Sequence, residues 1–451
     1  MANDSDNELL FSPLDNRYRK GLPRSLSEQA LLEAQIQVEI QYLECLMEEG
    51  LVGEAVSQAD LQKILSDLSF SEIEAIEERT QHATRALVEA IIDRLKKSGH
   101  SKASEWIHVG ITSFDTVDTA ARIRLKKYFT ADGFVAIENL KKELARLSKE
   151  YSNTPQVGRT HGQWAVPSLF GLVFGEIFER VQVAQKRLEY SWAELRGQAS
   201  GAVGAYQALG ILVDDPIAFE SRLTARLDLK PSLGSTQILP PEDMVALAQD
   251  FFLLCSPVAK LAHDLRHLAR SEIGEIAEGL SPGQVGSSTM PQKRNPWNLE
   301  HVCSLYKVLQ SRLELMQSDI LSEHQRDLTN SASGRFYSEF FCIAHLILSR
   351  MTRVLSRLEV FPEKMKSHLE AAGDTIFAEA LYVYLTQQGV SDAHNVVRQA
   401  SRKLTPETPS LVESLKSMGV LPKEFSFDEI KVEVFKGPRN KMSALVQSFG
   451  D

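Results

Sequence analysis

Cysteines are few in this sequence, and none is spaced to share a metal ion or to form a redox pair. The 451 residues contain four cysteines and no Cys-x-x-Cys sequence. This usage excludes a disulfide framework and gives no support for a zinc site. It fits a reducing, cytoplasmic setting. The four cysteines lie far apart, at Cys45, Cys255, Cys303 and Cys342.

Positive charge and long apolar runs are also scarce. The formal net charge of −10 at pH 7 argues against a general nucleic-acid-binding protein, although it is compatible with a local phosphate site. The N-terminal MANDSDNE lacks the basic start and the apolar run of a signal peptide. The longest apolar stretch, residues 165–178, contains Glu176 and is about four residues shorter than a spanning helix. We therefore expect a soluble cytoplasmic protein without a membrane segment.

Alternating β-type patterns are rare, and apolar residues instead recur every three or four positions. This spacing predicts amphipathic helices over residues 25–49 and 71–97. Five longer helices follow, with weak points at Gly133 and Pro257. Helices of this length are best explained by a bundle in which long faces pack together, so the expected fold class is all-α. The five ranges are 115–151, 168–196, 241–280, 297–322 and 334–360.

The pattern divides the chain into three expected domains. An N-terminal helical domain covers residues 1–110, a central long-helix bundle covers residues 111–360, and a small C-terminal helical domain covers residues 361–451. A glycine-rich stretch, residues 197–210, separates two of the long helices. No strand precedes it, so it is not a dinucleotide-binding fingerprint. Taken alone, it is a turn or a hairpin tip.

Residues 286–296 read GSSTMPQKRNP and are the most unusual stretch of the chain. A glycine and two prolines shape this loop. Its three hydroxyls, Asn295 and the cations Lys293 and Arg294 offer donors to an acidic ligand. The plain alternative is a connector between two helices, in which Asn295 before Pro296 caps the second helix.

Other polar stretches fall outside the apolar stripes, and each has a structural explanation as well as a functional one. A hydroxyl followed by an acid is what a helix start needs, and a histidine on a helix flank or in a loop can bond locally. His263 and His267 lie four residues apart on an expected helix but lack the HExxH surroundings of a zinc site, so no metal is expected. The remaining candidates are His82, Thr112, Ser113, His161, Arg326, Ser331 and Arg335.

Together these residues fit one chemistry, the removal of a proton next to a carboxylate with loss of a nitrogen group from the neighbouring carbon. Proton removal builds a second negative charge on the carboxylate, which Lys293, Asn295 and backbone amides can stabilise. A serine can be the base if its alkoxide is strongly stabilised, and a histidine can be the acid near neutral pH. No metal, flavin or nucleotide cofactor is required.

The loop at residues 286–296 resembles the signature loop of the fumarase/aspartase superfamily. HVGITSFDTVDTA and THGQ resemble two further blocks of that superfamily, in the expected order. The match is closest to the adenylosuccinate lyase family, because SPLDNRY, GAVGAY and QRDLTNSASGR resemble segments of that family. An argininosuccinate lyase would carry an RSRND-type block where this chain has TSFD.

The resemblance implies an adenylosuccinate lyase activity in purine biosynthesis, without a metal or cofactor. Such an enzyme eliminates fumarate from adenylosuccinate, giving AMP, and from SAICAR, giving AICAR. Ser287 would be the general base and His161 the general acid, assisted by His82. Lys293 and Asn295 would stabilise the aci-carboxylate. The residues that would bind the substrate are Arg17, Tyr18, Thr112, Ser113, Gln237, Arg326, Ser331 and Arg335.

The resemblance also implies a three-domain fumarase/aspartase-like fold and a homotetramer in which each active site draws on three chains. Two positions depart from the family pattern, because Ala83 follows His82 where the family has an acid, and Gln292 stands where many members have His. The alternatives are another lyase of the superfamily or a carboxymuconate-type cycloisomerase. A non-catalytic protein related to the lens crystallins is a third possibility, but it would lack a catalytic residue.

Overall fold

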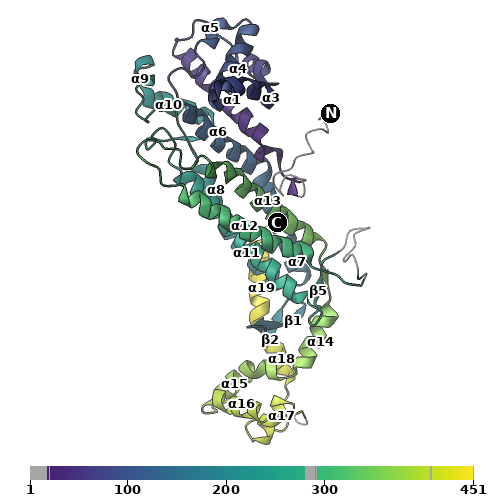
Figure 1. The fold of residues 1–451 in the computed structure, drawn as a ribbon. Helices are drawn as coiled ribbons and strands as arrows, with labels where there is room; N and C mark the ends of the chain where they lie inside the picture. Colours follow the sequence, from purple (N-terminus) through teal and green to yellow (C-terminus); the bar gives the residue numbers. More distant parts are fainter. Residues whose placement is uncertain (1–17, 20, 280–289, 291, 407–408, 450–451) are drawn as a thin grey trace. The chain divides into compact units, whose positions relative to one another are not determined.

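The computed structural model describes residues 18–449, apart from residues 20, 280–289, 291 and 407–408 (Figure 1). Two predicted site residues, Arg17 and Ser287, lie outside the described residues. The chain divides into two compact units. The first contains Met1–Ile137, Ala184–Cys255 and Leu305–Leu348, and the second contains Glu138–Val183, Ser256–Ser304 and Ser349–Asp451.

Helices dominate the first unit, which confirms the all-α prediction. Packing centres on helix α1 (Glu28–Glu48) and helix α6 (Ser113–Tyr128). The fully buried Tyr42 of α1 donates a hydrogen bond to the carbonyl of Val109 (2.8 Å) and meets the ring of Phe219 edge-on. Smaller elements here are η3 (Arg24–Leu26), α2 (Gln58–Leu65), α5 (Ser101–Ser104), α9 (Leu209–Leu212), α10 (Pro216–Arg226), η5 (Ser333–Phe336), β3 (Arg196–Gly197) and β4 (Lys230–Pro231).

The helix expected over residues 71–97 is wrong as a single element. Helix α3 (Phe70–Thr80) ends at Gln81, whose φ of 52° is left-handed, and helix α4 (Ala83–Lys97) starts after His82. A residue with such a φ cannot continue a right-handed helix. His82 is therefore the N-terminal cap of α4, and the prediction that it lies inside a helix is wrong.

The helix expected over residues 115–151 is interrupted at one of the predicted weak points. Helix α6 passes into a short π-helical segment, η4 (Phe129–Gly133), before helix α7 (Phe134–Glu150). A Cβ atom on Gly133 would lie 2.8 Å from Cδ1 of Phe129, which is closer than packed atoms allow. Glycine thus leaves room for the buried Phe129 ring where the helix changes its pitch.

The other long helices are present, and each contributes residues to both units. Helix α11 contains Pro257 and ends about a dozen residues before the predicted end. It is long and apolar enough to cross a membrane, but 61% of its most apolar window is buried inside the protein, as in a core helix. The four helices are α8 (Gly171–Ala193), α11 (Glu242–Leu268), α12 (Trp297–Ser318) and α13 (Tyr337–Ser356).

The second unit combines helices with two short antiparallel pairs. Helices α15 (Ala378–Gln387), α16 (Ala393–Arg402) and α17 (Leu411–Ser417) lie together in Figure 1 and share a core that includes Leu381, Val397 and Leu415. The three-domain division stays a prediction. The remaining elements are β1 (Pro155–Thr160), β2 (Gln163–Leu169), β5 (Ile276–Ala277), β6 (Glu359–Val360), α14 (Pro362–Ala372), η6 (Thr375–Phe377), α18 (Asp428–Glu433) and α19 (Lys436–Ser448).

Candidate active site

His161 lies at the tip of a β-hairpin rather than in an irregular loop, which corrects the sequence expectation. Strands β1 and β2 pair antiparallel, and their last pair is Thr160 with Gln163. The two residues between them, His161 and Gly162, have φ values of 55° and 74°. Positive φ at both central residues is the signature of a type I′ turn, which matches the twist of the strands. The side chain of His161 is exposed at this tip.

Thr112 and Ser113 form the start of helix α6, as helix-start chemistry predicts. Thr112 is the N-terminal cap, and its N–H donates to the carboxylate of Asp115 (2.8 Å). Both Thr112 and Ser113 are half-buried. The cap leaves backbone donors at the positive end of the helix, where a carboxylate is favoured.

Asp115 also holds the glycine-rich stretch against this helix start. Its fully buried carboxylate accepts the N–H groups of Ser200 (2.9 Å) and Gly201 (3.1 Å). Burial raises the pKa of Asp115 to about 6, and the backbone hydrogen bonds act against that rise. The stretch is therefore not a free turn but a loop fixed by a carboxylate.

Glu220 performs the same task on the other side of the glycine-rich stretch. Its buried carboxylate accepts the N–H of Ala199 (2.7 Å) and the hydroxyl of Tyr206 (3.0 Å). Burial raises the pKa of Glu220, and both hydrogen bonds oppose this. No sequence motif identified Glu220, because its importance depends on contacts between distant segments.

Gln237 connects the glycine-rich stretch to the segment that contains Arg326. The side chain of Gln237 donates to the carbonyl of Ala202 (3.0 Å), and its backbone N–H donates to the carbonyl of Gln325 (3.1 Å). The Arg326 guanidinium lies 3.9 Å from the centre of the Phe114 ring, next to Ser113. The first unit thus brings Thr112, Ser113, Gln237 and Arg326 into one neighbourhood.

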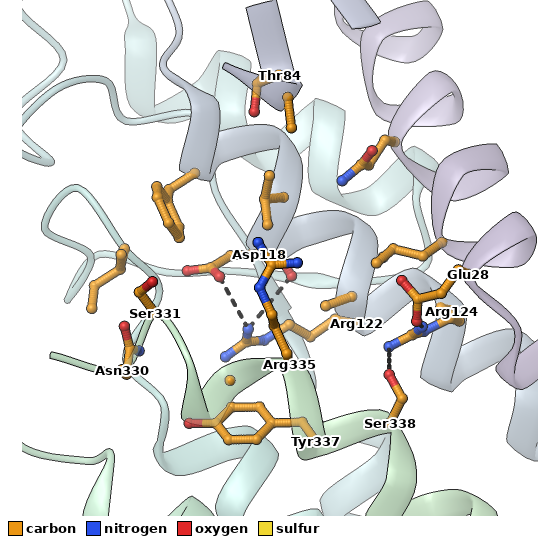
Figure 2. Close-up of a pocket in the computed structure, with 18 of the residues that line it drawn as sticks. Glu28, Thr84, Asp118, Arg122, Arg124, Asn330, Ser331, Arg335, Tyr337 and Ser338 are labelled. Carbon is orange, nitrogen blue, oxygen red and sulfur yellow. Dashed lines mark hydrogen bonds and ion pairs between the residues drawn. The ribbon is translucent and has the colours of Figure 1, made fainter. Parts of the chain in front are cut away.

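A cavity of about 870 Å³ adjoins this neighbourhood (Figure 2). Arg326, Ser331 and Arg335 line it, as do Asp118 and Arg122. Figure 2 shows that several charged side chains project into this space, with Asp118 and Arg122 joined as an ion pair. Its volume suits a small organic ligand, and its cationic groups suit an anion.

Two arginines of the cavity wall have internal partners. Arg122 is nearly fully buried and pairs with Asp243 (2.7 Å). Arg124 donates to the hydroxyl of Ser338 (2.6 Å) and lies 3.4 Å from the carboxylate of Glu28. Arg335, by contrast, is exposed. The exposed Arg335 is therefore accessible to a ligand, whereas the buried and paired Arg122 has a structural role.

His82 is exposed at the start of α4. Its Nδ1 accepts the N–H of Arg85 (3.2 Å), so the neutral ring carries its proton on Nε2. The Nε2–H can therefore serve as a donor. Tyr18, the first described residue, is half-buried.

The described end of the 286–296 loop gives Arg294 a structural role that sequence reasoning did not assign. Its guanidinium pairs with Glu359 (2.5 and 2.8 Å) and donates to the carbonyl of Glu278 (2.9 Å). The buried Glu278 in turn accepts the N–H groups of Asn298 and Leu299 at the start of α12. Arg294 thus connects the end of the loop to Glu278, which precedes the loop, and to Glu359 on strand β6.

Lys293 and Asn295 flank Arg294, and Lys293 is exposed whereas Asn295 is half-buried. Both belong to the second unit, as does His161. The first unit holds the other described candidates. Among the described residues there is no group of three or more histidine, cysteine or acidic side chains placed to bind a metal ion.

Two family models match the chain. A model described as lyase matches residues 13–308, and one described as adenylosuccinate lyase C-terminal matches residues 322–431.

Curated relatives match over nearly the whole chain. The adenylosuccinate lyase of Archaeoglobus fulgidus is 33% identical over 96% of this chain and 95% of its own length. The adenylosuccinate lyase of Pyrococcus abyssi is 32% identical over 89% and 88%.

Solved structures share the fold. The 3-carboxy-cis,cis-muconate lactonizing enzyme of Pseudomonas putida superposes with a TM-score of 0.81 at 21% identity, covering 95% of this chain and 97% of its own. A fumarate lyase from Mesorhizobium has a TM-score of 0.78 at 22% identity, covering 94% and 96%. These likenesses confirm the fumarase/aspartase-like fold.

Proposed function

This chain belongs to the adenylosuccinate lyase family, and we propose that it eliminates fumarate from adenylosuccinate with Ser287 as base and His161 as acid. It is accordingly a C–N lyase. The observation that carries the substrate assignment is the match to adenylosuccinate lyases over 96% of the chain, which includes the segment with Arg326, Ser331 and Arg335.

The reaction begins with removal of a proton from the succinyl group. The Ser287 alkoxide takes this proton from the carbon next to a carboxylate, and that carboxylate becomes an aci-carboxylate with a second negative charge. Lys293 and Asn295 stabilise this charge by donating hydrogen bonds that strengthen as it develops. The start of α6, with Thr112 and Ser113, binds a succinyl carboxylate through its backbone donors.

The C–N bond then breaks, and the departing nitrogen of the purine needs a proton. His161 supplies it as the general acid. Its exposed position on a two-residue turn between paired strands supports this role, because a turn of defined geometry orients the donor toward the substrate. His82 assists through its Nε2–H.

The enzyme must also bind the phosphate of the nucleotide. Arg326, Ser331 and Arg335 line one cavity in the first unit, and we assign the nucleotide to them together with Arg17, Tyr18 and Gln237. A guanidinium binds phosphate through paired hydrogen bonds, which a substrate without phosphate does not require. This argument favours a nucleotide over a carboxymuconate.

We also propose a cytoplasmic homotetramer whose active sites combine residues from several chains. Helix α8 exposes Val183 and Tyr190, which are 53% and 69% accessible and lie seven residues apart on one helix face. These two side chains fit a helix face that another subunit covers, because subunit interfaces contain contiguous apolar surface.

A substrate panel tests the assignment. Purified protein is offered adenylosuccinate, SAICAR, argininosuccinate and 3-carboxymuconate, and fumarate or lactone is quantified. We expect turnover of the first two only. Turnover of carboxymuconate without turnover of adenylosuccinate would favour the cycloisomerase alternative instead.

A further inference from the structure

A fully buried carboxylate in the second unit carries four hydrogen bonds that the proposed mechanism does not use. Glu275 lies just before strand β5 and has no exposed surface. It accepts from Gln156 (2.6 Å), from both terminal nitrogens of Arg159 (2.6 and 3.1 Å) and from Nδ1 of His368 (2.6 Å). Such a set satisfies both oxygens of the carboxylate.

The negative charge of Glu275 balances the positive charge of Arg159 in this cluster. Arg159 and His368 are mostly buried, with 16% and 12% of their side chains exposed. Burial raises the pKa of Glu275, but the hydrogen bonds from Arg159, Gln156 and His368 lower it by more than burial raises it. The pKa of Glu275 is therefore below its ordinary value. Glu275 is therefore an anion, and removing it leaves the Arg159 charge buried without compensation.

Two of these partners belong to the strand that leads to His161. Gln156 and Arg159 are on β1, and Arg159 is two residues before His161. The strand register shifts between Val157 and Arg159, and a Cβ on Gly158 would lie 2.9 Å from the carbonyl oxygen of Val166. This bulge bends the strand just before the turn, and a bulge re-aims the residues that follow it.

The third partner holds the other strand. His368 is on helix α14, and its ring lies 6.1 Å from the ring of Trp164 on β2. Trp164 is the cross-strand partner of Arg159. One carboxylate thus fixes both strands of the hairpin, on either side of the bulge and below its tip.

We propose that Glu275 is a positioning residue for His161, which sets the direction of the hairpin tip through Arg159, Gln156 and His368. The proposal rests on the function proposed for His161. Glu275 itself touches no reacting atom, and it acts by keeping the type I′ turn in one orientation. A side chain misplaced by about 1 Å costs up to about a hundredfold in rate.

A double-mutant cycle separates this role from general stabilisation. Glu275→Gln keeps the size of the side chain and removes its charge. We expect it to lower kcat about tenfold or more with KM changed less than about threefold, because the loss lies in the transition state. In the His161→Ala background the same substitution should cost less than about twofold, because residues that act as a unit are not additive.

Glu54→Gln is the matched control, since Glu54 accepts the N–H of Ala103 (2.6 Å) in helix α5 and does not line the cavity. It should lower kcat less than about twofold in either background. If the losses from Glu275→Gln and His161→Ala multiply, Glu275 acts independently and the positioning role is wrong. If His161→Ala alone is as fast as the wild type, the proposed function of His161 fails first, and the positioning role falls with it.

A milder pair of variants covers the case in which Glu275→Gln does not fold. His368→Asn keeps an N–H donor for Glu275, and His368→Leu removes it. We expect the Asn variant to stay within about twofold of wild-type kcat and the Leu variant to fall about three- to tenfold, and only in chains that retain His161. Equal kcat values for the two variants would overturn the proposal.

Discussion

Four buried carboxylates in this protein accept hydrogen bonds from several backbone or side-chain donors. Asp115 and Glu220 hold the glycine-rich stretch, Glu275 holds the hairpin, and Glu278 caps helix α12. Each joins segments that are far apart in sequence. Because an unpaired buried charge is costly, each of these carboxylates holds its donor groups in place.

The first prediction concerns the proposed acid and base. His161→Ala and Ser287→Ala should each lower kcat by about 10²- to 10⁴-fold, because each removes one proton-transfer group, while KM changes little. Steady-state release of fumarate measures both. His394→Ala, which removes an exposed histidine of α16, is the control and should leave kcat unchanged. A Ser287→Ala enzyme with wild-type kcat would exclude Ser287 as the base.

The second prediction concerns Asp115 and pH. Its folded pKa of about 6 is above the ordinary 3.8, so the folded state binds this proton more tightly than the unfolded state. The stability from this group is therefore fully present below about pH 4 and lost as pH rises through about 6. A difference of about two pKa units corresponds to about 3 kcal/mol.

Asp115→Asn removes this titration. The stability advantage of wild type over the variant should therefore shrink by about 2 kcal/mol between about pH 4.5 and 7.5. Denaturant unfolding of both proteins at the two pH values measures the change. An advantage that is the same at both pH values would show that Asp115 does not titrate in this range.

At the scale of elements, the type I′ turn makes a prediction about Gly162. Gly162→Ala places a side chain at a φ of 74°, which costs about 1–2 kcal/mol and twists the turn that carries His161. We expect kcat to fall about tenfold or more. Gly389→Ala is the matched control, because Gly389 has a φ of 81° and open space around it but lies at the end of a C-terminal helix. Equal effects of the two variants on kcat would contradict a special role of this turn.

Most long helices could be predicted from the sequence, because apolar spacing alone defines a helix face. The break at Gln81 could not, since Gln has no preference for a left-handed φ that a sequence would reveal. The hairpin around His161 was also missed, because its strands contain Pro155 and Pro167, and proline is disfavoured within strands. The candidate site residues came from a resemblance of motifs, whereas Glu220 and Glu275 belong to no motif and emerge only from long-range contacts.

At the scale of the whole molecule, the candidate residues are divided between the two units. His161, Lys293 and Asn295 belong to the second unit, and Thr112, Arg326 and their neighbours to the first. Because we propose active sites that combine residues from several chains, we predict that an active site takes its acid and its base from different chains of the tetramer. His161→Ala and Ser287→Ala proteins, each nearly inactive, are dissociated, mixed in equal amounts and reassembled.

If the acid and the base come from different chains, about one site in four contains both groups after random reassembly. About a quarter of the wild-type activity should then return. Each variant reassembled alone is the control. No recovery in the mixture, with tetramers reformed, would place both groups in one chain.

We propose above all that this chain eliminates fumarate from adenylosuccinate with His161 as the acid. The most direct test follows adenylosuccinate by proton NMR with wild-type and His161→Ala protein in parallel. We predict that the wild type forms fumarate and AMP in equal amounts and that the variant forms both at least about a hundredfold more slowly. No fumarate from the wild type would contradict the proposed function, and equal rates from the two proteins would contradict the role of His161.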